Sequence, residues 1–453
     1  MPSHRHPGRQ TVFAGQWLHS IRNPHYLTLS FWHPRTQLIR SHAASFQVVN
    51  ETIRYLQSCT DDEEIDIPKL VDCVIIDAVK AGASDIHIEP WENTIAVRIR
   101  ISGVLNELVH LPSDLLPKIT GRLKVMANLI GHETSLPQEG RASTFPEAGN
   151  VVLRVSTFPT IRGEKIVMRI FDPTSRSFDL GGLGMEEETL LTLKTLLAKP
   201  TGLILLTGPT GSGKTTAIYA ALNHLIDRAG PSISVATVED PVEFNLPLIA
   251  QSQCNPAREY TYPIALRSLM RQDPQVIMIG EIRDAETANI AVQAGLTGHL
   301  VLSTIHSSST AGVFARLINM GIEPFLLASS VAGVLGLRLV RKNCPGCSES
   351  YTPDEAVLRL LPEEVVATAQ FQKGVGCQTC AHTGFSGRAT VTEMLIVDEL
   401  LRDAILEKMP TLRLQDLAIK GGLKTLWQLG LRRVVRGETT VEEIMRVIGM
   451  EGF

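Results

Sequence analysis

The sequence predicts an α/β protein in which a small α+β domain precedes a parallel β-sheet covered by helices. Three observations support this fold class. Short strands with period-two hydrophobicity and two helical stretches occupy residues 69–171. From residue 185 to about residue 341, apolar strands alternate with helical segments, a pattern typical of parallel sheets. Between the two regions, the polar stretch 172–184 contains three Gly and one Pro and is expected to be a linker.

Length and composition are those of an ordinary globular protein. The chain has 453 residues, 44% hydrophobic and 20% charged, which suggests about three domains, or two with an appendage. The net charge of −4 provides no chain-wide positive field to attract nucleic acid or anionic lipid. No apolar run reaches the ~18 residues of a membrane span, and the N-terminus lacks a signal-peptide core. We therefore expect a cytoplasmic protein, in which the apolar run Phe325 to Val340 is a buried helix.

Residues 1–60 form a short N-terminal segment in which one strand, Tyr26 to Trp32, is the main expected element. Residues 1–50 contain five Arg and six His but no Lys, Asp or Glu. Two explanations of that charge stay open: an accessory terminus with little fold of its own, or an arm that binds nucleic acid. The acidic stretch 61–64 and the residues up to Pro68 are expected to link this segment to the first domain.

The first domain is expected to span residues 69–171. Its predicted elements are a helix at 69–82, strands at 85–89 and 95–101, a helix at 115–130, and strands at 151–157 and 165–171.

The second domain is expected to span residues 185–341 and to contain apolar strands at 203–207, 234–238, 276–279 and 300–304. Residues 342–390 follow as a cysteine-containing insert. Residues 391–453 are expected to form a helical C-terminal region, with amphipathic helices at 399–408 and 441–448.

A glycine-rich loop joins the strand at 203–207 to a helical stretch from Thr215 to Ile226. It has the spacing Gly-x-x-x-x-Gly-Lys-Thr between a strand and a helix, which is the setting that a P-loop requires. Its glycines let backbone N–H groups turn toward phosphate oxygens at the start of the helix. The lysine would neutralise phosphate charge, and the following threonine would bind Mg²⁺. The predicted ATP cradle consists of Gly208, Pro209, Thr210, Gly211, Ser212, Gly213, Lys214, Thr215 and Thr216.

Carboxylates follow two other apolar strands. Glu281 comes after the strand at 276–279, and Glu239, Asp240 and Glu243 end or follow the strand at 234–238. The carboxyl ends of parallel strands meet at one edge of a sheet, so we expect these acids near the cradle. Glu281 would hold Mg²⁺ together with Thr215, and one glutamate would act as general base. The residues leave open whether Glu243 or Glu281 is the base, and a solvated acidic turn is the alternative for the upstream group.

Two histidines flank the strand at 300–304. We expect His299 to be a structural residue. For His306, at the end of the strand, a structural role and a catalytic role as a sensor of the γ-phosphate both stay open.

Four of the seven cysteines lie in two Cys-x-x-Cys pairs. Two such pairs suit tetrahedral zinc in a closed structural site. The predicted zinc ligands are Cys344, Cys347, Cys377 and Cys380. The remaining Cys59, Cys73 and Cys254 are expected to be buried small hydrophobic residues.

These elements, in this order, resemble the ATPase superfamily that powers type II secretion and type IV pilus assembly. In that family they are called Walker A, Asp box, Walker B and His box. The resemblance covers about residues 70–450. Further strings that resemble the family are Ala83 to Pro90, Leu136 to Arg141, Arg154 to Thr160, Gly163 to Lys165 with Arg169, Arg271 to Pro274, and Gly280 to Asp284.

The resemblance implies a PAS-like N-terminal domain joined flexibly to a RecA-like motor, with nucleotide bound between them in a homo-hexameric ring. Arg154, Arg162 and Arg169 of the small domain would then reach the phosphates. The implied partners are an inner-membrane platform protein and a cytoplasmic adaptor, without direct contact to nucleic acid. The implied location is the cytoplasmic side of a bacterial inner membrane.

The resemblance leaves several functions open. The first is assembly of pilin or pseudopilin fibres, which the cysteine pairs favour because typical retraction ATPases of the superfamily lack them. Pilus retraction and DNA uptake are alternatives within the superfamily. A ring-shaped scaffold that does not hydrolyse ATP is an alternative in which the protein is not an enzyme. The short segment 1–60 matches the usual N-terminal module weakly and favours a short paralogue.

Overall fold

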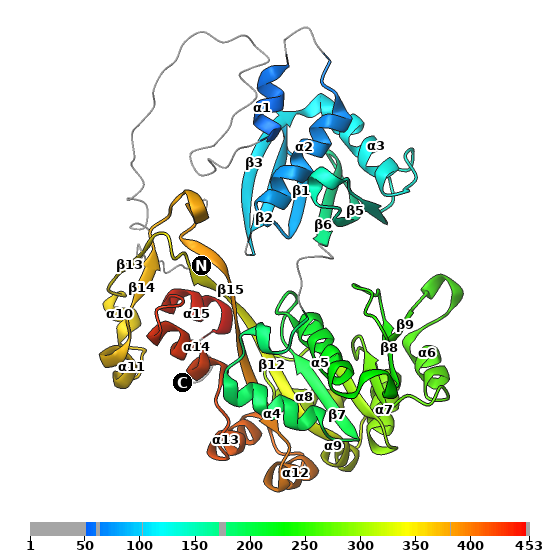
Figure 1. Cartoon of the computed structure of the whole chain (residues 1–453), viewed down its shortest axis with the longest axis vertical. Helices are drawn as coiled ribbons and strands as arrows, with labels where there is room; N and C mark the ends of the chain where they lie inside the picture. The colour runs from blue at the N-terminus through cyan, green and yellow to red at the C-terminus, as the bar shows by residue number, and fades with distance from the viewer. Residues whose placement is uncertain (1–50, 60–63, 102, 172–177, 381, 450–453) are drawn as a thin grey trace, which may run out of the picture.

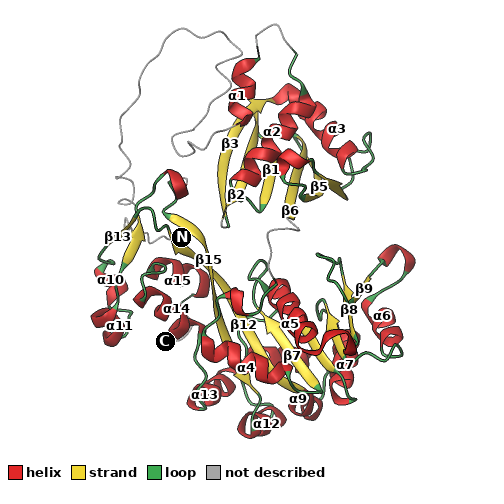
Figure 2. Cartoon of the chain, in the orientation of Figure 1, coloured by secondary structure: helices red, strands yellow, loops and turns green. Residues whose placement is uncertain are grey.

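The computed structural model describes residues 51–59, 64–101, 103–171, 178–380 and 382–449 (Figure 1). The strand expected at 26–32 and the acidic residues 61–63 lie outside the described residues. The predicted α/β fold class is confirmed. An antiparallel sheet with helices forms the first domain, and a mixed, mainly parallel sheet with helices forms the second (Figure 2).

The first domain is built on a six-stranded sheet in the order β3-β2-β1-β6-β5-β4, with every neighbouring pair antiparallel. Its strands are β1 Asp85–Pro90, β2 Thr94–Ile101, β3 Val104–Pro112, β4 Gln138–Ser143, β5 Val152–Thr160 and β6 Gly163–Phe171. The sequence prediction missed the two edge strands, β3 and β4. The outer part of β3 is not buried, and β4 is polar and alternates little, so neither shows clear period-two hydrophobicity.

Within the described residues, three α-helices belong to this domain: α1 Glu51–Ser58, α2 Ile67–Lys80 and α3 Leu116–Met126. Their apolar side chains share one core with the sheet. The helix α1 was not predicted from the sequence, and a buried acid attaches it to α2. The Asp77 carboxylate accepts hydrogen bonds from the backbone N–H of Thr52 at 2.9 Å and from its hydroxyl at 2.6 Å.

The second domain is built on a seven-stranded sheet in the order β15-β12-β7-β11-β10-β8-β9. All neighbours are parallel except β12 and β15. The strands are β7 Gly202–Thr207, β8 Val235–Glu239, β9 Ala250–Gln253, β10 Val276–Ile279, β11 Leu300–Ile305, β12 Val331–Asn343 and β15 Phe385–Ile396. The sheet therefore extends beyond the expected boundary at residue 341, and the boundary expected at 390 falls inside β15.

The expectation of a buried helix from Phe325 to Val340 is wrong. The helix α9 covers only Pro324–Ser330, and the chain continues as strand β12. This strand lies between β7 and β15 and is apolar on both faces, so its hydrophobicity is continuous rather than alternating. A continuous apolar run does not distinguish a buried strand from a buried helix.

Helices cover both faces of the seven-stranded sheet, which is called the motor sheet from here on (Figure 1). The helices α4 Glu187–Leu197 and α5 Lys214–Ala229 pack on the face that contains Ile204 and Leu206. The opposite face, which contains Leu203 and Leu205, is covered by α6 Tyr262–Leu269, α7 Ala285–Leu296, α8 Gly312–Asn319 and α9. The alternation of these β7 side chains between the two cores is the expected result of a strand buried on both sides.

The C-terminal part contains a small cysteine-bearing unit and four helices. The unit has a two-stranded ribbon, β13 Ser348–Ser350 and β14 Gln372–Gly374, and two short helices, α10 Glu355–Leu358 and α11 Glu363–Thr368. The final helices are α12 Glu399–Leu406, α13 Thr411–Lys420, α14 Leu426–Val435 and α15 Val441–Ile448, so both expected amphipathic helices are present. Among the described residues, no helix is sufficiently long and apolar to cross a membrane.

Candidate active site

The four predicted motifs come together at the carboxyl edge of the motor sheet. Strands β7, β8, β10 and β11 are parallel neighbours, so the segments that follow them meet at one edge. The loop after β7 is the predicted phosphate cradle, and α5 begins within it at Lys214. This edge is where open parallel sheets bind ligands.

The cradle is held close to the neighbouring strand β12. Gly208 has φ +151°, and a Cβ atom there would lie 2.5 Å from the carbonyl oxygen of Leu337. Only glycine fits this approach. The Lys214 ammonium donates hydrogen bonds to the carbonyl oxygens of Gly208 at 2.7 Å and Pro209 at 3.0 Å. The lysine is therefore folded over the loop that carries the predicted phosphate ligands.

The charges around Lys214 come from both sides of the cradle. Burial lowers the pKa of the Lys214 ammonium from its ordinary value, and the charge of Arg338 acts in the same direction. Glu281 opposes both effects, which places its carboxylate within electrostatic reach of the lysine. A phosphate at this edge would add negative charge and favour the charged lysine.

Glu281 and His306 lie side by side. The Glu281 carboxylate forms an ion pair with Arg283, and its other oxygen is 3.5 Å from His306 Nε2. The loop after β11 is attached to the end of β7, just before the cradle, because the Thr207 hydroxyl bonds to both the N–H and the carbonyl of Ser307, each at 3.1 Å. His306 is therefore positioned by the strand that leads into the cradle. His299 faces the carbonyl oxygen of Ala294 at 3.2 Å, in keeping with the expected structural role.

The three upstream acids have different environments. Glu239, at the end of β8, is 2% exposed, and its carboxylate accepts hydrogen bonds from the Thr237 hydroxyl at 2.6 Å and Gln251 Nε2 at 3.0 Å. The Tyr219 hydroxyl also donates to it. Asp240 and Glu243 are exposed. The segment thus contains one buried acid and two exposed ones.

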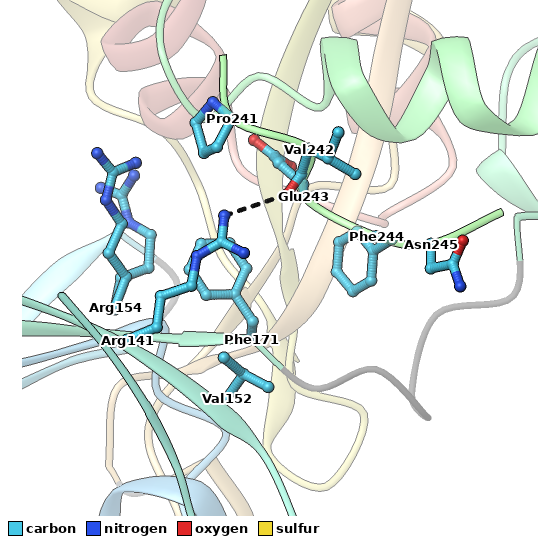
Figure 3. A pocket seen from close by; sticks show the side chains of 10 residues that line it. Arg141, Val152, Arg154, Phe171, Pro241, Val242, Glu243, Phe244 and Asn245 are labelled. Atoms are coloured by element: carbon cyan, nitrogen blue, oxygen red, sulfur yellow. Dashed lines mark hydrogen bonds between the residues drawn. The ribbon is translucent and has the colours of Figure 1, made fainter. Parts of the chain in front are cut away.

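A cavity of about 250 Å³ lies between the two domains, at the loop that carries Glu243 (Figure 3). Arg141 donates a hydrogen bond to the carbonyl of Val242 at 3.3 Å across this cavity. Of the three arginines named from the resemblance, Arg154 and Arg169 line the cavity, whereas Arg162 is not among its lining residues. The remaining lining residues are Val152, Phe171, Pro241, Phe244 and Asn245.

Three arginines near the site were not named as site residues from the sequence: Arg141, Arg338 and Arg283, which pairs with Glu281. Arg141 ends the stretch Leu136 to Arg141, which resembles the family, but its contact with the Val242 loop depends on how the two domains pack against each other. Arg338 lies on β12, and its guanidinium donates to the Ser308 carbonyl at 3.0 Å. The sequence signal that could have identified Arg338 is the run Arg338 to Arg341, which resembles a string of the same family.

The four predicted zinc ligands form a cluster. Their sulfur atoms all lie within 4.8 Å of one another, and the Cys344–Cys377, Cys347–Cys380 and Cys377–Cys380 distances are 3.8, 3.7 and 3.8 Å. A tetrahedral zinc ion with Zn–S bonds of about 2.3 Å would separate its sulfur ligands by about 3.8 Å. Backbone N–H groups of Gly376 and Gly384 also point at two of the sulfurs, as expected for thiolates. The cluster fits zinc. Outside it, Cys254 is buried as expected, whereas Cys59 and Cys73 are only partly buried.

This fold and site define a P-loop nucleotide-binding protein, and the comparisons with known proteins identify its family. The family model described as "Type II/IV secretion system protein" matches residues 60–446. The chain belongs to this family.

Curated relatives agree with this assignment. Type II secretion system protein E of Pseudomonas aeruginosa is 43% identical over 388 residues, which are 85% of this chain and 76% of the relative. The type IV pilus assembly ATPase PilB of Myxococcus xanthus is 42% identical over 399 residues, 87% of this chain and 70% of the relative. The chain is thus a secretion- and pilus-type ATPase, which sets aside the alternative of a non-hydrolysing scaffold.

Solved structures show the same fold. The ATPase DotB of Legionella pneumophila matches with a TM-score of 0.64 at 20% identity, covering 85% of this chain and 97% of DotB. The pilus retraction motor PilT, solved with ADP, matches with a TM-score of 0.55 at 23% identity, covering 85% of this chain and 97% of PilT.

Proposed function

We propose that this ATPase drives the assembly of type IV pilin or type II pseudopilin fibres through an inner-membrane platform protein. The observation that carries the proposal is the four-cysteine cluster, which lies on the chain between β12 and β15 of the motor sheet. Among the related motors, such an insert is typical of secretion and extension ATPases and absent from typical retraction ATPases. The names of the relatives from P. aeruginosa and M. xanthus support the same assignment.

The cradle residues would bind and orient the triphosphate of ATP. Backbone N–H groups of the loop and the first turn of α5 would face the phosphate oxygens, and Lys214 would neutralise their charge. Thr215 and Glu281 would hold Mg²⁺, which when bound would shield the charge that develops between the β- and γ-phosphates.

Glu243 is our candidate for the general base that orients the attacking water. It is exposed and lines the interdomain cavity, whereas Glu281 follows β10 and lies next to His306. This arrangement favours Glu281 for the metal side of the reaction and Glu243 for the water side. His306, beside Glu281, would respond to the loss of the γ-phosphate.

Arginines of the small domain would complete the site when the domains close. Arg141 and Arg154 line the cavity beside the Glu243 loop, and a planar guanidinium suits bidentate contact with phosphate. Release of phosphate would then let the small domain swing relative to the motor. We place this cycle in a homo-hexameric ring at the cytoplasmic side of the inner membrane, with a cytoplasmic adaptor as a further partner.

A count of surface fibres tests the direction of the motor. The gene is replaced in its own bacterium by a version that encodes Lys214→Ala, with Lys199→Ala as the control because Lys199 is exposed and outside the cradle. Fewer fibres with Lys214→Ala alone would support assembly. More fibres would identify a retraction motor, and normal fibres with impaired DNA uptake would identify an uptake motor. Either result would contradict the proposal.

A further inference from the structure

Tyr219 is a fully buried tyrosine within the motor, although it was not expected to be a site residue. It lies on α5, four residues after Thr215 and therefore about one helical turn further along the same face. Its side chain is 0% exposed and is among the largest that are fully buried. A buried hydroxyl needs partners, so the atoms that satisfy it show what this tyrosine holds in place.

The hydroxyl joins Glu239, at the end of β8, to the backbone of Glu243 in the loop that follows. It donates its single proton to the Glu239 carboxylate, which can only accept. It also accepts a hydrogen bond from the backbone N–H of Glu243 at 3.3 Å. Burial, followed by the interaction with Glu239, raises the pKa of Tyr219, so the hydroxyl keeps its proton in the working pH range. Glu239 is itself fixed by Thr237 and Gln251.

The ring of Tyr219 contacts both the Glu243 loop and the end of the interdomain linker. Phe178 and Phe244 approach it edge-on, with ring centroids at 5.3 and 6.3 Å. Phe178 and Phe244 also meet each other at 5.3 Å. Phe244 follows Glu243 directly, and Phe178 is the first described residue of the linker. Each aromatic contact adds a directional preference to the burial.

We propose that Tyr219 is a positioning residue for ATP hydrolysis, which fixes the Glu243 loop relative to the helix that begins in the phosphate cradle. Glu239 then serves as the anchor of the Tyr219 hydroxyl. The inference rests on the proposed role of Glu243 as the general base. An error of about 1 Å in the position of such a group costs about 100-fold in rate, so even a small shift of this loop would be measurable.

The test compares Tyr219→Phe with Tyr351→Phe in the purified full chain. Tyr351 is a matched control, because its hydroxyl donates to the Glu442 carboxylate at 2.8 Å and its ring meets Phe371 edge-on, far along the chain from the cradle. The measurements are kcat and KM for Mg²⁺-dependent ATP hydrolysis, the Kd of a fluorescent ATP analogue, and the melting temperature.

Tyr219→Phe keeps the ring contacts and removes the hydroxyl. We expect kcat to fall at least about tenfold, with the Kd of the analogue within about twofold of wild type. Tyr351→Phe should leave kcat unchanged, even if it lowers the melting temperature as much as Tyr219→Phe does. A kcat for Tyr219→Phe within about twofold of wild type would overturn the proposal.

Two further variants separate the possible failures. If Glu243→Gln retains wild-type hydrolysis, the proposed role of Glu243 fails, whereas an inactive Glu243→Gln beside a normal Tyr219→Phe refutes the role of Tyr219 alone. If Tyr219→Phe does not fold, Glu239→Gln tests the same anchor from the other side. It should lower kcat without changing the Mg²⁺ concentration that gives half-maximal rate, and an unchanged kcat would overturn the inference.

Discussion

Glu239 and Glu243 are four positions apart in one segment, and both were predicted as catalytic from the same cluster of acids. Burial separates them: Glu239 is 2% exposed and bonded to three side chains, whereas Glu243 is exposed beside the interdomain cavity. Spacing along a strand end predicts that carboxylates gather at the sheet edge. It does not predict which of them turns inward, because that depends on partners such as Tyr219 that come from elsewhere in the chain.

The cradle could be named residue by residue, because nine consecutive residues carry its chemistry. The arginines of the site could not be named from the sequence, since their positions depend on the packing of two domains. Arg154 and Arg169 line the cavity, and so does Arg141, which the sequence analysis did not name as a site residue. Arg162 lies in the turn between β5 and β6 and is outside the set of lining residues.

The first prediction therefore compares two of these arginines. Arg154→Ala should lower kcat/KM for ATP by about tenfold, because the guanidinium that we propose to contact the phosphates is lost. Arg162→Ala should leave kcat/KM within about twofold of wild type. Steady-state kinetics on both variants provides the test, and an equal loss in the two would contradict the proposed role of Arg154.

Among the secondary-structure elements, the run from Phe325 to Val340 shows the limit of hydrophobic pattern. Its length suits a helix, but β12 is buried on both sides and pairs with β7 and β15. In contrast, the strands β7, β8, β10 and β11 were predicted almost to the residue, because a turn signal or a charged residue bounds each apolar stretch. The edge strand β4 was missed because its side chains are mostly polar.

Glu443 connects an element of the C-terminal region to the motor sheet. Its carboxylate, 1% exposed, pairs with Arg341 of β12 and with Arg446 of α15, both at 2.7 Å. Burial disfavours the charged form, but the hydrogen bonds from the two arginines outweigh it and lower the pKa of Glu443. A lowered folded-state pKa means that this contribution to stability is present above the unfolded pKa of about 4.3 and is lost as the pH falls through the folded pKa.

We therefore predict that Glu443→Gln lowers the free energy of unfolding by about 2 kcal/mol at pH 7, less than for a fully buried pair because Arg446 is half exposed. The difference from wild type should shrink as the pH falls below about 4. Urea midpoints at several pH values measure this. Glu355→Gln, which removes an exposed pair with Arg359, is the control and should change little. A pH-independent difference for Glu443→Gln would contradict the linkage.

A separate prediction concerns the zinc content of variants of the cysteine cluster. Cys344→Ser should reduce bound zinc from about one ion per chain to well under one and lower the melting temperature, because a closed site needs all four ligands. Cys73→Ser, in the first domain and outside the cluster, should retain the metal. Metal analysis of the purified variants decides the question. Little zinc in the wild-type protein itself would refute the site.

At the scale of the whole molecule, the sequence predicted a small α+β domain, a mainly parallel sheet, two cysteine pairs and a helical tail, and the corresponding elements follow one another in this order in the structure. The linker was expected at 172–184, but its described end is packed: Leu180 is 2% exposed, and the Phe178 ring contacts Tyr219. Such contacts join segments that are distant in sequence, so local composition does not predict them. They place Phe178, at the described end of the linker, against Phe244 of the Glu243 loop.

The central claim is that the cradle at the edge of the motor sheet hydrolyses ATP. The most direct test is Mg²⁺-dependent phosphate release by the purified full chain, with Lys214→Ala and the exposed control Lys199→Ala measured beside wild type. We predict that wild type and Lys199→Ala hydrolyse ATP at equal rates and that Lys214→Ala is slower by at least about 100-fold. Equal rates for Lys214→Ala and wild type would contradict the account.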